Sequence, residues 1–286
     1  MAKHAFVILH YNNYLDTIEC IDSIINNINH KNYHIVVVDN QSPNNSGKIL
    51  LSKYFNHNKV TVILSDKNLG FAKGNNLGFE YAKKKLNSDF IILINNDTEI
   101  HQEDFLKKIE KKYEMHSFAV LGPDIITLDN IHQNPQKLIG YNMKAIVFQI
   151  IRYCTLLVLN ILNLEHTIRK FISNKKYEKD VSLIEWNKEQ INVQLHGSCL
   201  IFSGEYIKLF DGLYDGTFMY LEEDILFYLC KKFNLKTVYS PEVQITHKED
   251  LSTNATFTSS KLKNRFIYRH SLYSAIKLFE IMMKGK

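Results

Sequence analysis

The stretch Phe90-Ile91-Ile92-Leu93-Ile94-Asn95-Asn96-Asp97-Thr98-Glu99 predicts an α/β fold. Five consecutive apolar residues end at a polar cluster, and such a run is typical of a parallel strand that is buried on both faces. Ligands of open α/β sheets bind beyond the carboxyl ends of the strands, which is where Asp97 falls. We therefore expect Asp97 to bind a divalent cation, Mn²⁺ or Mg²⁺. The alternative is that Asp97 or Thr98 only caps a helix that begins near His101.

Three shorter apolar runs come earlier in the chain, at residues 5–9, 35–38 and 60–64. A helical pattern follows the first run, so we expect strands that alternate with helices and a mainly parallel sheet flanked by helices. The carboxyl ends of parallel strands share one edge of the sheet. We expect the polar residues that follow the strands to meet at this edge, namely His10, Tyr11, Asn12, Asp39, Asn68 and Asp97.

Asp39 has two interpretations. The sequence Asp39-Asn40-Gln41-Ser42-Pro43 is ordinary turn chemistry. A carboxylate at a strand end can also accept hydrogen bonds from a ribose or a nucleobase, and the neighbouring strand ends favour this second role.

Residues 68–78 carry a glycine at every fourth position, at Gly70, Gly74 and Gly78. This spacing differs from the dinucleotide-binding fingerprint. Glycines let a backbone approach a ligand closely, and a helix that begins after a glycine can hold a diphosphate. The alternative is close packing of this helix on the sheet.

The second half of the chain continues the strand pattern. We expect short strands at residues 193–195, 199–202 and 237–240, and an edge strand at 243–247 that ends in His247. A histidine at a strand end can be a metal ligand, and its ordinary role is that of a satisfied surface or core group.

Residues 218 to about 233 predict a helix that contains Glu222, Glu223 and Asp224 near its start. Three successive acids at a helix start interact favourably with the helix dipole. Repulsion between them would raise the pKa of at least one, and a carboxylate with a raised pKa suits a general base. These residues alone leave both interpretations open.

The bulk properties limit the classes of protein. With 286 residues, 45% hydrophobic and 23% charged, the chain is long enough for one large α/β domain and too apolar to be disordered. The net charge of +5 fits an acidic ligand or an anionic membrane surface and is too weak to indicate nucleic-acid binding. Four scattered cysteines and an immediate strand pattern lead us to expect a reduced, cytoplasmic protein without a signal peptide.

Residues 144–176 differ in character from the rest. From Ala145 to Leu164 the segment is nearly all apolar, and its polar members lie on one stripe: Gln149, Arg152, Asn160 and Asn163. These polar groups argue against a spanning helix, whereas a broad apolar face with basic flanks suits a helix at a membrane interface. The alternative is a core helix of the soluble domain.

Residues 257–286 predict basic amphipathic helices with the same two interpretations. We therefore divide the chain into a domain of residues 1–256, with a helical insertion at about 144–176, and a C-terminal helical region of residues 257–286.

Six of these stretches, in this order, resemble the inverting family-2 glycosyltransferases of the GT-A fold. The resemblance is to the branch that builds bacterial cell-surface polysaccharides and includes rhamnosyltransferase-like enzymes. The matching stretches span about residues 4–253 and are 36–42, 68–76, 93–98, 197–199, 218–224 and 240–247. The resemblance implies a Rossmann-like GT-A fold with C-terminal helices.

The resemblance also implies an activity. A sugar would move from a UDP- or dTDP-sugar to a saccharide acceptor, typically lipid-linked, with inversion at the anomeric carbon. The setting would be capsule, O-antigen or exopolysaccharide synthesis, with the enzyme in the cytoplasm, peripheral at the inner face of the plasma membrane. No nucleic-acid partner is expected, and a homo-oligomer stays open.

Roles for single residues follow from the resemblance. Asp39 would hold the uracil or thymine and its ribose, and Asp97 matches the final acid of the DxD-type motif that binds the metal. His247 matches a histidine that can complete the metal site. The positions expected to contact the nucleotide are His10, Tyr11, Asn12, Asp39, Asn68, Gly70, Asn75, Asn76, Asn96 and Gly197.

The chain departs from the family pattern at two places. Asn95 replaces the first acid of the DxD-type motif. The family's helix reads Glu-Asp-Val-Asp-Leu, and ungapped alignment makes Glu223 the general base, whereas a shift of one residue makes it Asp224. Ile225 stands at the position of the second Asp of that pattern.

Two alternatives to this function remain. A sugar nucleotidyltransferase would need a glycine-rich, basic loop after the first strand, where His10-Tyr11-Asn12-Asn13 stands instead. A catalytically inactive homologue that scaffolds a polysaccharide assembly complex would not need Glu223, Asp97 or His247, which are all present.

Overall fold

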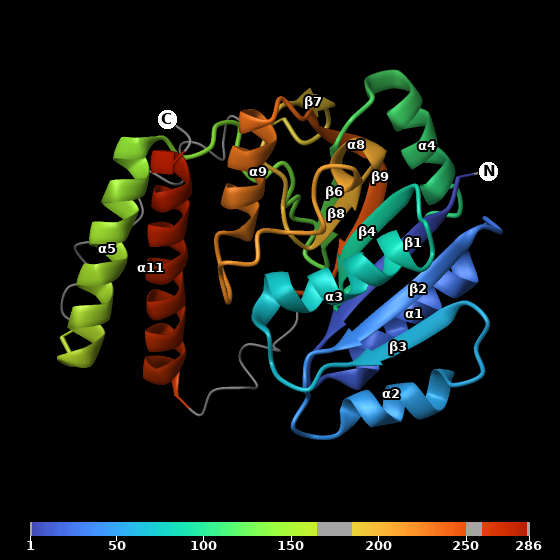
Figure 1. The fold of residues 1–286 in the computed structure, drawn as a ribbon, viewed down its shortest axis with the longest axis horizontal. Helices are drawn as coiled ribbons and strands as arrows, with labels where there is room; N and C mark the ends of the chain where they lie inside the picture. The colour runs from blue at the N-terminus through green and yellow to red at the C-terminus, as the bar shows by residue number, and fades with distance from the viewer. Residues whose placement is uncertain (1, 165–184, 250–258, 285–286) are drawn as a thin grey trace.

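The computed structural model describes residues 2–164, 185–249 and 259–284. Its centre is one mixed sheet in the order β3-β2-β1-β4-β8-β6-β9-β5, with β7 paired to β9 (Figure 1). Four parallel strands form the first half: β1 (His4–His10), β2 (Tyr33–Asp39), β3 (Val60–Leu64) and β4 (Phe90–Asn95). These strands are the four apolar runs predicted from the sequence.

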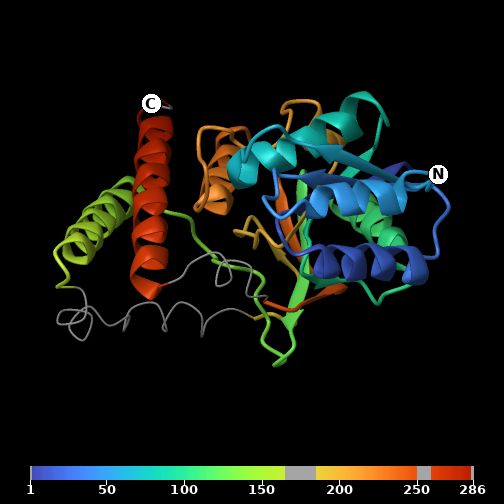
Figure 2. The ribbon, with the colours of Figure 1, turned by 90° about the horizontal axis from the view of Figure 1, so that it is seen from below.

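Helices cover both faces of this half, as Figures 1 and 2 show. On one face, Phe6 and Ile8 of β1 pack in a core with α1 (Tyr14–Asn27), α2 (Ser46–Tyr54) and α4 (Phe105–His116). On the other face, Ala5 and Val7 pack in a second core with α3 (Gly70–Lys84). Alternate residues of a strand point to opposite faces, so a continuous apolar run is what a strand between two cores requires.

The second half of the sheet is mixed. Strand β8 (Cys199–Phe202) runs antiparallel to β4 and β6 (Val120–Thr127), and β6 is parallel to β9 (Thr237–His247). The short strands β5 (Thr98–Glu99) and β7 (Gln190–Ile191) both pair antiparallel with β9.

This half of the sheet differs from the sequence predictions in three respects. Residues 193–195 are not a strand, because Gln194 makes only an isolated bridge to Lys137. The two strands expected at 237–240 and 243–247 are one strand, in which Pro241 lies where the register with β6 shifts. A proline is tolerated at such a bulge because no ladder hydrogen bond is needed there. Strand β6 was not predicted.

Two helix starts also differ from expectation. Helix α4 begins at Phe105, and β5 intervenes between it and Asp97, so Asp97 does not cap that helix. Helix α9 (Glu222–Lys232) begins at Glu222 instead of residue 218, and a short helix α8 (Gly204–Ile207) precedes it. Tyr220 and Leu221, directly before α9, have φ values of 73° and 64°. Non-glycine residues rarely adopt this left-handed backbone, so the turn before the three acids is strained.

Helices α5 (Met143–Ile161) and α11 (Ser260–Lys284) pack side by side and form an arm beside α9 (Figure 1). The C-terminal region is thus one described helix where several were expected. The proposed boundary at 256/257 and residues 165–176 of the insertion lie outside the described residues.

Asn160 of the polar stripe of α5 faces the inside of this arm. It is 1% exposed, donates from Nδ2 to the carbonyl of Lys261 and accepts from Nε of Arg265. Ile146 is buried in a core with Ile225 and Leu278, whereas 64% of Phe148 and 59% of Ile151 are exposed. One side of α5 is thus packed and the other is an exposed apolar face, and its role at a membrane stays a prediction.

Candidate active site

Asp97 and His247 meet at the carboxyl edge of the sheet. The pairing of β5 with β9 sets Thr98 opposite His247, which brings His247 Nε2 to 3.3 Å from Asp97 Oδ1. His247 Nδ1 lies 2.7 Å from Gln133 Oε1, an atom that can only accept. Nδ1 therefore carries a proton, and in the neutral ring the Nε2 lone pair faces the Asp97 carboxylate.

This arrangement fits a divalent cation. Two electron-pair donors that face each other at 3.3 Å repel unless a positive charge lies between them. Adjacent ligands of an octahedral ion with bonds of about 2.1 Å stand about 3 Å apart. A histidine whose other nitrogen donates to an oxygen is also the usual form of a metal-ligating imidazole. Asp97 and His247 are thus compatible with the metal roles predicted for them.

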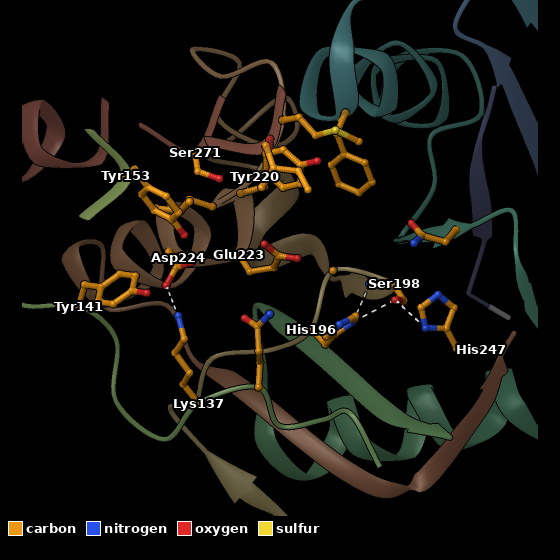
Figure 3. Close-up of a pocket in the computed structure, with 18 residues that line it drawn as sticks. Lys137, Tyr141, Tyr153, His196, Ser198, Tyr220, Glu223, Asp224, His247 and Ser271 are labelled. Atoms are coloured by element: carbon orange, nitrogen blue, oxygen red, sulfur yellow. Dashed lines mark hydrogen bonds and ion pairs between the residues drawn. The ribbon is translucent and has the colours of Figure 1, made fainter. Parts of the chain in front are cut away.

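A cavity of about 450 Å³ opens beside this pair (Figure 3). Four predicted site residues line it: Gly197, Glu223, Asp224 and His247. Most other lining residues come from the loops before α5, β8 and α9 and from both helices of the arm. They include Lys137, Tyr141, Tyr153, His196, Tyr220, Ile267 and Ser271. The arm is therefore a wall of the cavity as well as an outer surface.

Glu223 and Asp224 have different surroundings. Asp224 Oδ1 accepts from Lys137 Nζ at 2.8 Å, and this ion pair is largely buried. Glu223 points the other way, toward His196, as Figure 3 shows. Its carboxylate lies over Gly197, where an added Cβ would be 2.4 Å from Glu223 Oε1. Only glycine leaves room for Glu223 in this position.

The pKa values of the first two acids are raised. Burial is the main cause for Glu223, and the charge of Asp224 adds to it. Burial and then the charge of Glu223 raise the pKa of Glu222 to about 8. Glu222 is only 7% exposed and accepts from Thr217 Oγ1, so it supports the turn. All three acids line the cavity, but Glu222 is held by Thr217 and Asp224 by Lys137. The Glu223 carboxylate instead lies over Gly197, and its raised pKa suits a proton acceptor.

His196 lies between Glu223 and His247 (Figure 3). Its Nδ1 accepts from the Ser198 backbone N–H at 3.2 Å, so its ring proton sits on Nε2. Burial and the neighbouring His247 lower the pKa of His196 to about 4, which keeps the ring neutral. Ser198 Oγ lies 2.9 Å from His196 Nδ1 and 3.4 Å from His247 Nδ1, and so joins the two histidines.

Asp39 lies at the same edge, at the end of β2, and β1 separates β2 from β4. The register pairs it with His10. Ser42 donates to Asp39 from both its backbone N–H, at 3.2 Å, and its hydroxyl, at 2.5 Å. His10 is fully buried beneath this turn, and its ring nitrogens contact Thr17 Oγ1 and Ser46 Oγ. Burial lowers the pKa of His10 to about 4, so a neutral ring supports Asp39 from below.

The start of α3 is closed by the protein itself. The backbone N–H groups of Leu69, Gly70 and Phe71 donate to Asn40 Oδ1, Asn68 Oδ1 and the Phe218 carbonyl respectively. Gly70 has a φ of +79°, and a Cβ there would lie 2.1 Å from the Phe218 oxygen. These three N–H groups are engaged within the protein, and diphosphate binding at this helix start stays a prediction. Gly74 and Gly78 pack on Leu9 and Val7 of β1, as the alternative predicted.

Several other predicted positions are occupied by internal hydrogen bonds. Both ends of the Asn76 amide bind the Leu213 backbone, at 2.7 Å each, and Asn75 Nδ2 donates to the Phe71 carbonyl. Asn96 Nδ2 donates to Thr17 Oγ1 and to the Asn13 carbonyl. Tyr11 and Asn12 are partly exposed at the end of β1, and the Asn12 backbone N–H donates to Ser42 Oγ.

Sequence reasoning did not select Lys137, His196 or Tyr153. Lys137 and Tyr153 lie far in sequence from the acids, in a segment without strand pattern, so no local signal marks them. His196 precedes Gly197-Ser198, a short polar break before a strand, and this break is the signal that could have found it.

Comparisons with known proteins agree with this geometry. The family model described as "Glycosyl transferase family 2" matches residues 5–176. A low-salt glycan biosynthesis hexosyltransferase, Agl10 of Haloferax volcanii, is 24% identical over 243 residues, which are 84% of this chain and 68% of that protein. A dTDP-rhamnosyl transferase, RfbF of Shigella flexneri, is 30% identical over 115 residues, which are 40% of this chain and 37% of that protein.

Solved structures show the same fold. Residues 1–349 of S. aureus TarS in complex with UDP give a TM-score of 0.57 at 14% identity, over 98% of this chain and 64% of that one. GalNAc-T7 with UDP, GalNAc and Mn²⁺ gives a TM-score of 0.60 at 14% identity, over 94% of this chain and 47% of that one. At this identity the likeness supports the GT-A fold and leaves substrates open.

Proposed function

The chain belongs to glycosyl transferase family 2, and from this membership we propose that it moves a hexosyl or rhamnosyl group from a UDP- or dTDP-sugar to a saccharide acceptor, with inversion. The relatives in glycan biosynthesis support this substrate class. The proposal rests on one observation above all. Of the three acids at the cavity, Glu223 lies over Gly197, whereas Glu222 is held by Thr217 and Asp224 by Lys137.

Glu223 is the proposed general base. Its raised pKa makes it a better proton acceptor than an ordinary glutamate once it is ionised. It takes the proton of an acceptor hydroxyl as that oxygen attacks the anomeric carbon, the bond from that carbon to the diphosphate breaks, and one displacement inverts the centre. Asp224 is then a positioning residue that holds Lys137 and fixes the start of α9.

Asp97 and His247 are the proposed ligands of Mn²⁺ or Mg²⁺, because Asp97 Oδ1 and His247 Nε2 lie 3.3 Å apart and His247 lines the cavity. Such a cation, when bound, supplies Lewis-acid stabilisation of the departing diphosphate. The chain's own contribution is to orient His247 through Gln133 and Ser198. His196, neutral and with a proton on Nε2, is a hydrogen-bond donor for the same diphosphate.

Asp39 is proposed to accept from the base or ribose of the donor, with Tyr11 and Asn12 beside it and His10 beneath. Asn40, Asn68, Gly70, Asn75, Asn76 and Asn96 then act indirectly, since their hydrogen bonds shape the backbone of this edge. Gly197 contributes by leaving space for the base.

The acceptor is proposed to lie against the arm, where Tyr141, Tyr153 and Tyr220 line the cavity. Aromatic rings bury apolar sugar faces and offer a hydroxyl to the rim. The arm's outer face has the character of a membrane-binding surface, because exposed apolar residues of α5 accompany basic residues of α11. We therefore propose a lipid-linked acceptor at the inner face of the plasma membrane.

One described helix, Met143–Ile161, is long and apolar enough to cross a membrane, and 17% of its most apolar window is buried. We propose that it lies on the membrane surface, because it carries Arg152, which bonds Gln149 of the same helix, and Asn160, which bonds α11. A spanning helix would place these polar groups in hydrocarbon. Capsule, O-antigen or exopolysaccharide synthesis is the setting that such an acceptor suggests.

The experiment is a turnover screen. Purified protein is incubated with UDP- and dTDP-sugars, Mn²⁺ or Mg²⁺ and saccharide acceptors, and release of the nucleoside diphosphate is measured. The anomeric coupling of the product then reports its configuration. Transfer with inversion supports the proposal. Release of a nucleoside monophosphate, or a product with retained configuration, would overturn it.

A further inference from the structure

A second group of histidine and carboxylate side chains lies at the opposite end of the sheet. His4 is the first residue of β1, His30 lies in the loop between α1 and β2, and Glu110 is on α4. Since His10 at the other end of β1 supports the candidate active site, this group is separated from that site by the full length of the strand. Among the described residues it is the one group of three such side chains whose ligand atoms converge, all within 4.8 Å of one another.

The distances in this group suit a small cation. Glu110 Oε1 is 3.7 Å from His4 Nε2 and 3.6 Å from His30 Nε2. Two ligands of a tetrahedral ion with bonds of about 2.1 Å lie about 3.4 Å apart. The His4 and His30 rings meet edge to face with centroids 5.1 Å apart, so the rings do not stack over each other and leave space at their edges.

Three buried polar atoms of this group lack a hydrogen bond of good geometry, namely both ring nitrogens of His4 and Oε1 of Glu110. His4 is 1% exposed, and the backbone of Asn32 and Ala2 lies near its ring. Buried polar atoms that are poorly partnered destabilise the folded chain. Burial also disfavours a charged imidazolium, so the neutral ring, which is the form that binds metals, is favoured at His4.

We propose that His4, His30 and Glu110 bind one Zn²⁺, with water as the fourth ligand. Two imidazole nitrogens and one carboxylate oxygen are a donor set that suits Zn²⁺. Coordination through His30 Nε2 moves that ring's proton to Nδ1. The backbone N–H of Asn32 now donates to this Nδ1 at 3.2 Å. Zinc binding would therefore break this one hydrogen bond.

The ion has a structural role. It joins helix α4 to the start of β1 and the loop before β2, two segments that already share the hydrogen bond from His4 N–H to the Asn32 carbonyl. Nearby, Asn29 N donates to the Glu103 carbonyl and Asn27 Nδ2 to the Ile100 carbonyl. A metal that binds only the folded chain raises its stability, so zinc at this site is read out in the melting temperature, independently of sugar transfer.

The alternative occupant of the space is a water molecule, which can bridge the same three atoms. The experiment separates the two. Protein is loaded with Zn²⁺, dialysed against metal-free buffer, and its zinc content and melting temperature are measured before and after addition of a chelator. We expect about one zinc ion per chain and a melting temperature that falls on chelation.

Variants assign the site. His30→Ala and Glu110→Gln are the suitable variants, because the Glu110 side chain is 29% exposed and the His30 side chain, 5% exposed, lies in a loop and not in the central strand that carries His4. We expect the alanine and glutamine variants to lose the zinc and its thermal shift. His57→Ala is the matched control, because His57 Nδ1 accepts from the backbone N–H two residues later, as His30 does, without a carboxylate beside it. It keeps the zinc.

Asp97→Asn tests whether the metal belongs to the other end of the sheet, and it also keeps the zinc. Wild-type protein without zinc, or with no shift on chelation, would overturn the proposal in favour of water. Zinc that persists in His30→Ala and Glu110→Gln, or that is lost in Asp97→Asn, would overturn it as well.

Discussion

Two regions border the candidate active site. One is the strand edge, formed by the carboxyl ends of β1, β2 and β4, and the other is the helical wall, formed by α9 and the arm. They hold their polar groups in different ways. At the strand edge, Asp39, Asn40 and Asn68 are fixed by hydrogen bonds to their own loops. On the helical wall, Glu223 is fixed by space over Gly197 and by a strained turn. This difference agrees with the proposed division of roles, in which the strand edge binds the nucleotide and the helical wall carries the base and contacts the acceptor.

Asp97→Ala is expected to have the largest effect and would break the comparison at the strand edge. Transfer should fall at least about 10³-fold, because a cation at the leaving group supplies several kcal/mol of charge stabilisation. Initial rates are measured across a Mn²⁺ titration. Asp104→Ala is the control, since Asp104 is an exposed acid seven positions on that pairs only with Lys108. Full activity of Asp97→Ala in a chelator would contradict the metal role.

Glu223→Gln tests the helical wall. We expect kcat to fall at least about 10²-fold, the usual size of a general-base effect, while the KM for the donor stays unchanged. Asp224→Asn should be milder, because its partner Lys137 lies outside the reaction. If Asp224→Asn abolishes transfer and Glu223→Gln does not, the two assignments must be exchanged.

The pH profile of the wild type adds a second signature. A base works in its ionised form, and the pKa of Glu223 is raised by burial. Activity should therefore be retained above this raised pKa and lost as the pH falls through it, at a higher pH than for an ordinary carboxylate. In Glu223→Gln this limb of the profile should disappear.

The double variant Phe148→Ser with Ile151→Ser sharpens the contrast by testing the outer face of the arm. Each large apolar side chain contributes about 1.5–3 kcal/mol when fully buried, so vesicle affinity should fall at least about tenfold. Co-sedimentation with anionic vesicles at low and high salt measures this. Leu128→Ser with Ile131→Ser, which removes exposed apolar groups near the end of β6, is the control. Absence of binding by the folded wild type would remove the membrane proposal and leave the transferase intact.

Tyr153→Ala is expected to have the smallest effect. Loss of one aromatic contact is worth about 0.5–1.5 kcal/mol, so the KM for the acceptor should rise about threefold to tenfold while the donor KM stays constant. Steady-state kinetics with each substrate varied in turn measure both. Tyr273→Ala, at an exposed tyrosine of α11, should change neither value. An equal rise in both KM values would show that the wall does not separate donor from acceptor.

The sequence predicts the strand edge better than the helical wall for a physical reason. Buried parallel strands are continuous apolar runs, so β1 to β4 are marked residue by residue. Gly122 and Pro123 interrupt the apolar pattern of β6, and Pro241 interrupts that of β9. Both segments are nevertheless strands, because they pair with each other in the sheet. The choice between Glu223 and Asp224 depends on Lys137, 87 positions away in the chain, and no local pattern contains it.

The arm shows a second limit. Periodicity separates a polar stripe from an apolar face of α5 but does not say which side points inward. Asn160 points inward because its amide forms hydrogen bonds with Arg265 and with the Lys261 carbonyl of α11. These partners are about a hundred residues away in the chain. The direction of an amphipathic helix is thus a tertiary property.

The contact between Gly70 and Phe218 has a consequence for how this protein can change over time. The Phe71 N–H bonds the Phe218 carbonyl, and any side chain at position 70 would collide with that same oxygen. Helix α9, which carries the proposed base, begins four residues after Phe218. The segments around Gly70 and Phe218, 148 positions apart, must therefore change together in evolution. A lineage that replaces Gly70 must rebuild the turn before α9 in the same step, so exchanging one segment between relatives without the other should yield inactive chimaeras.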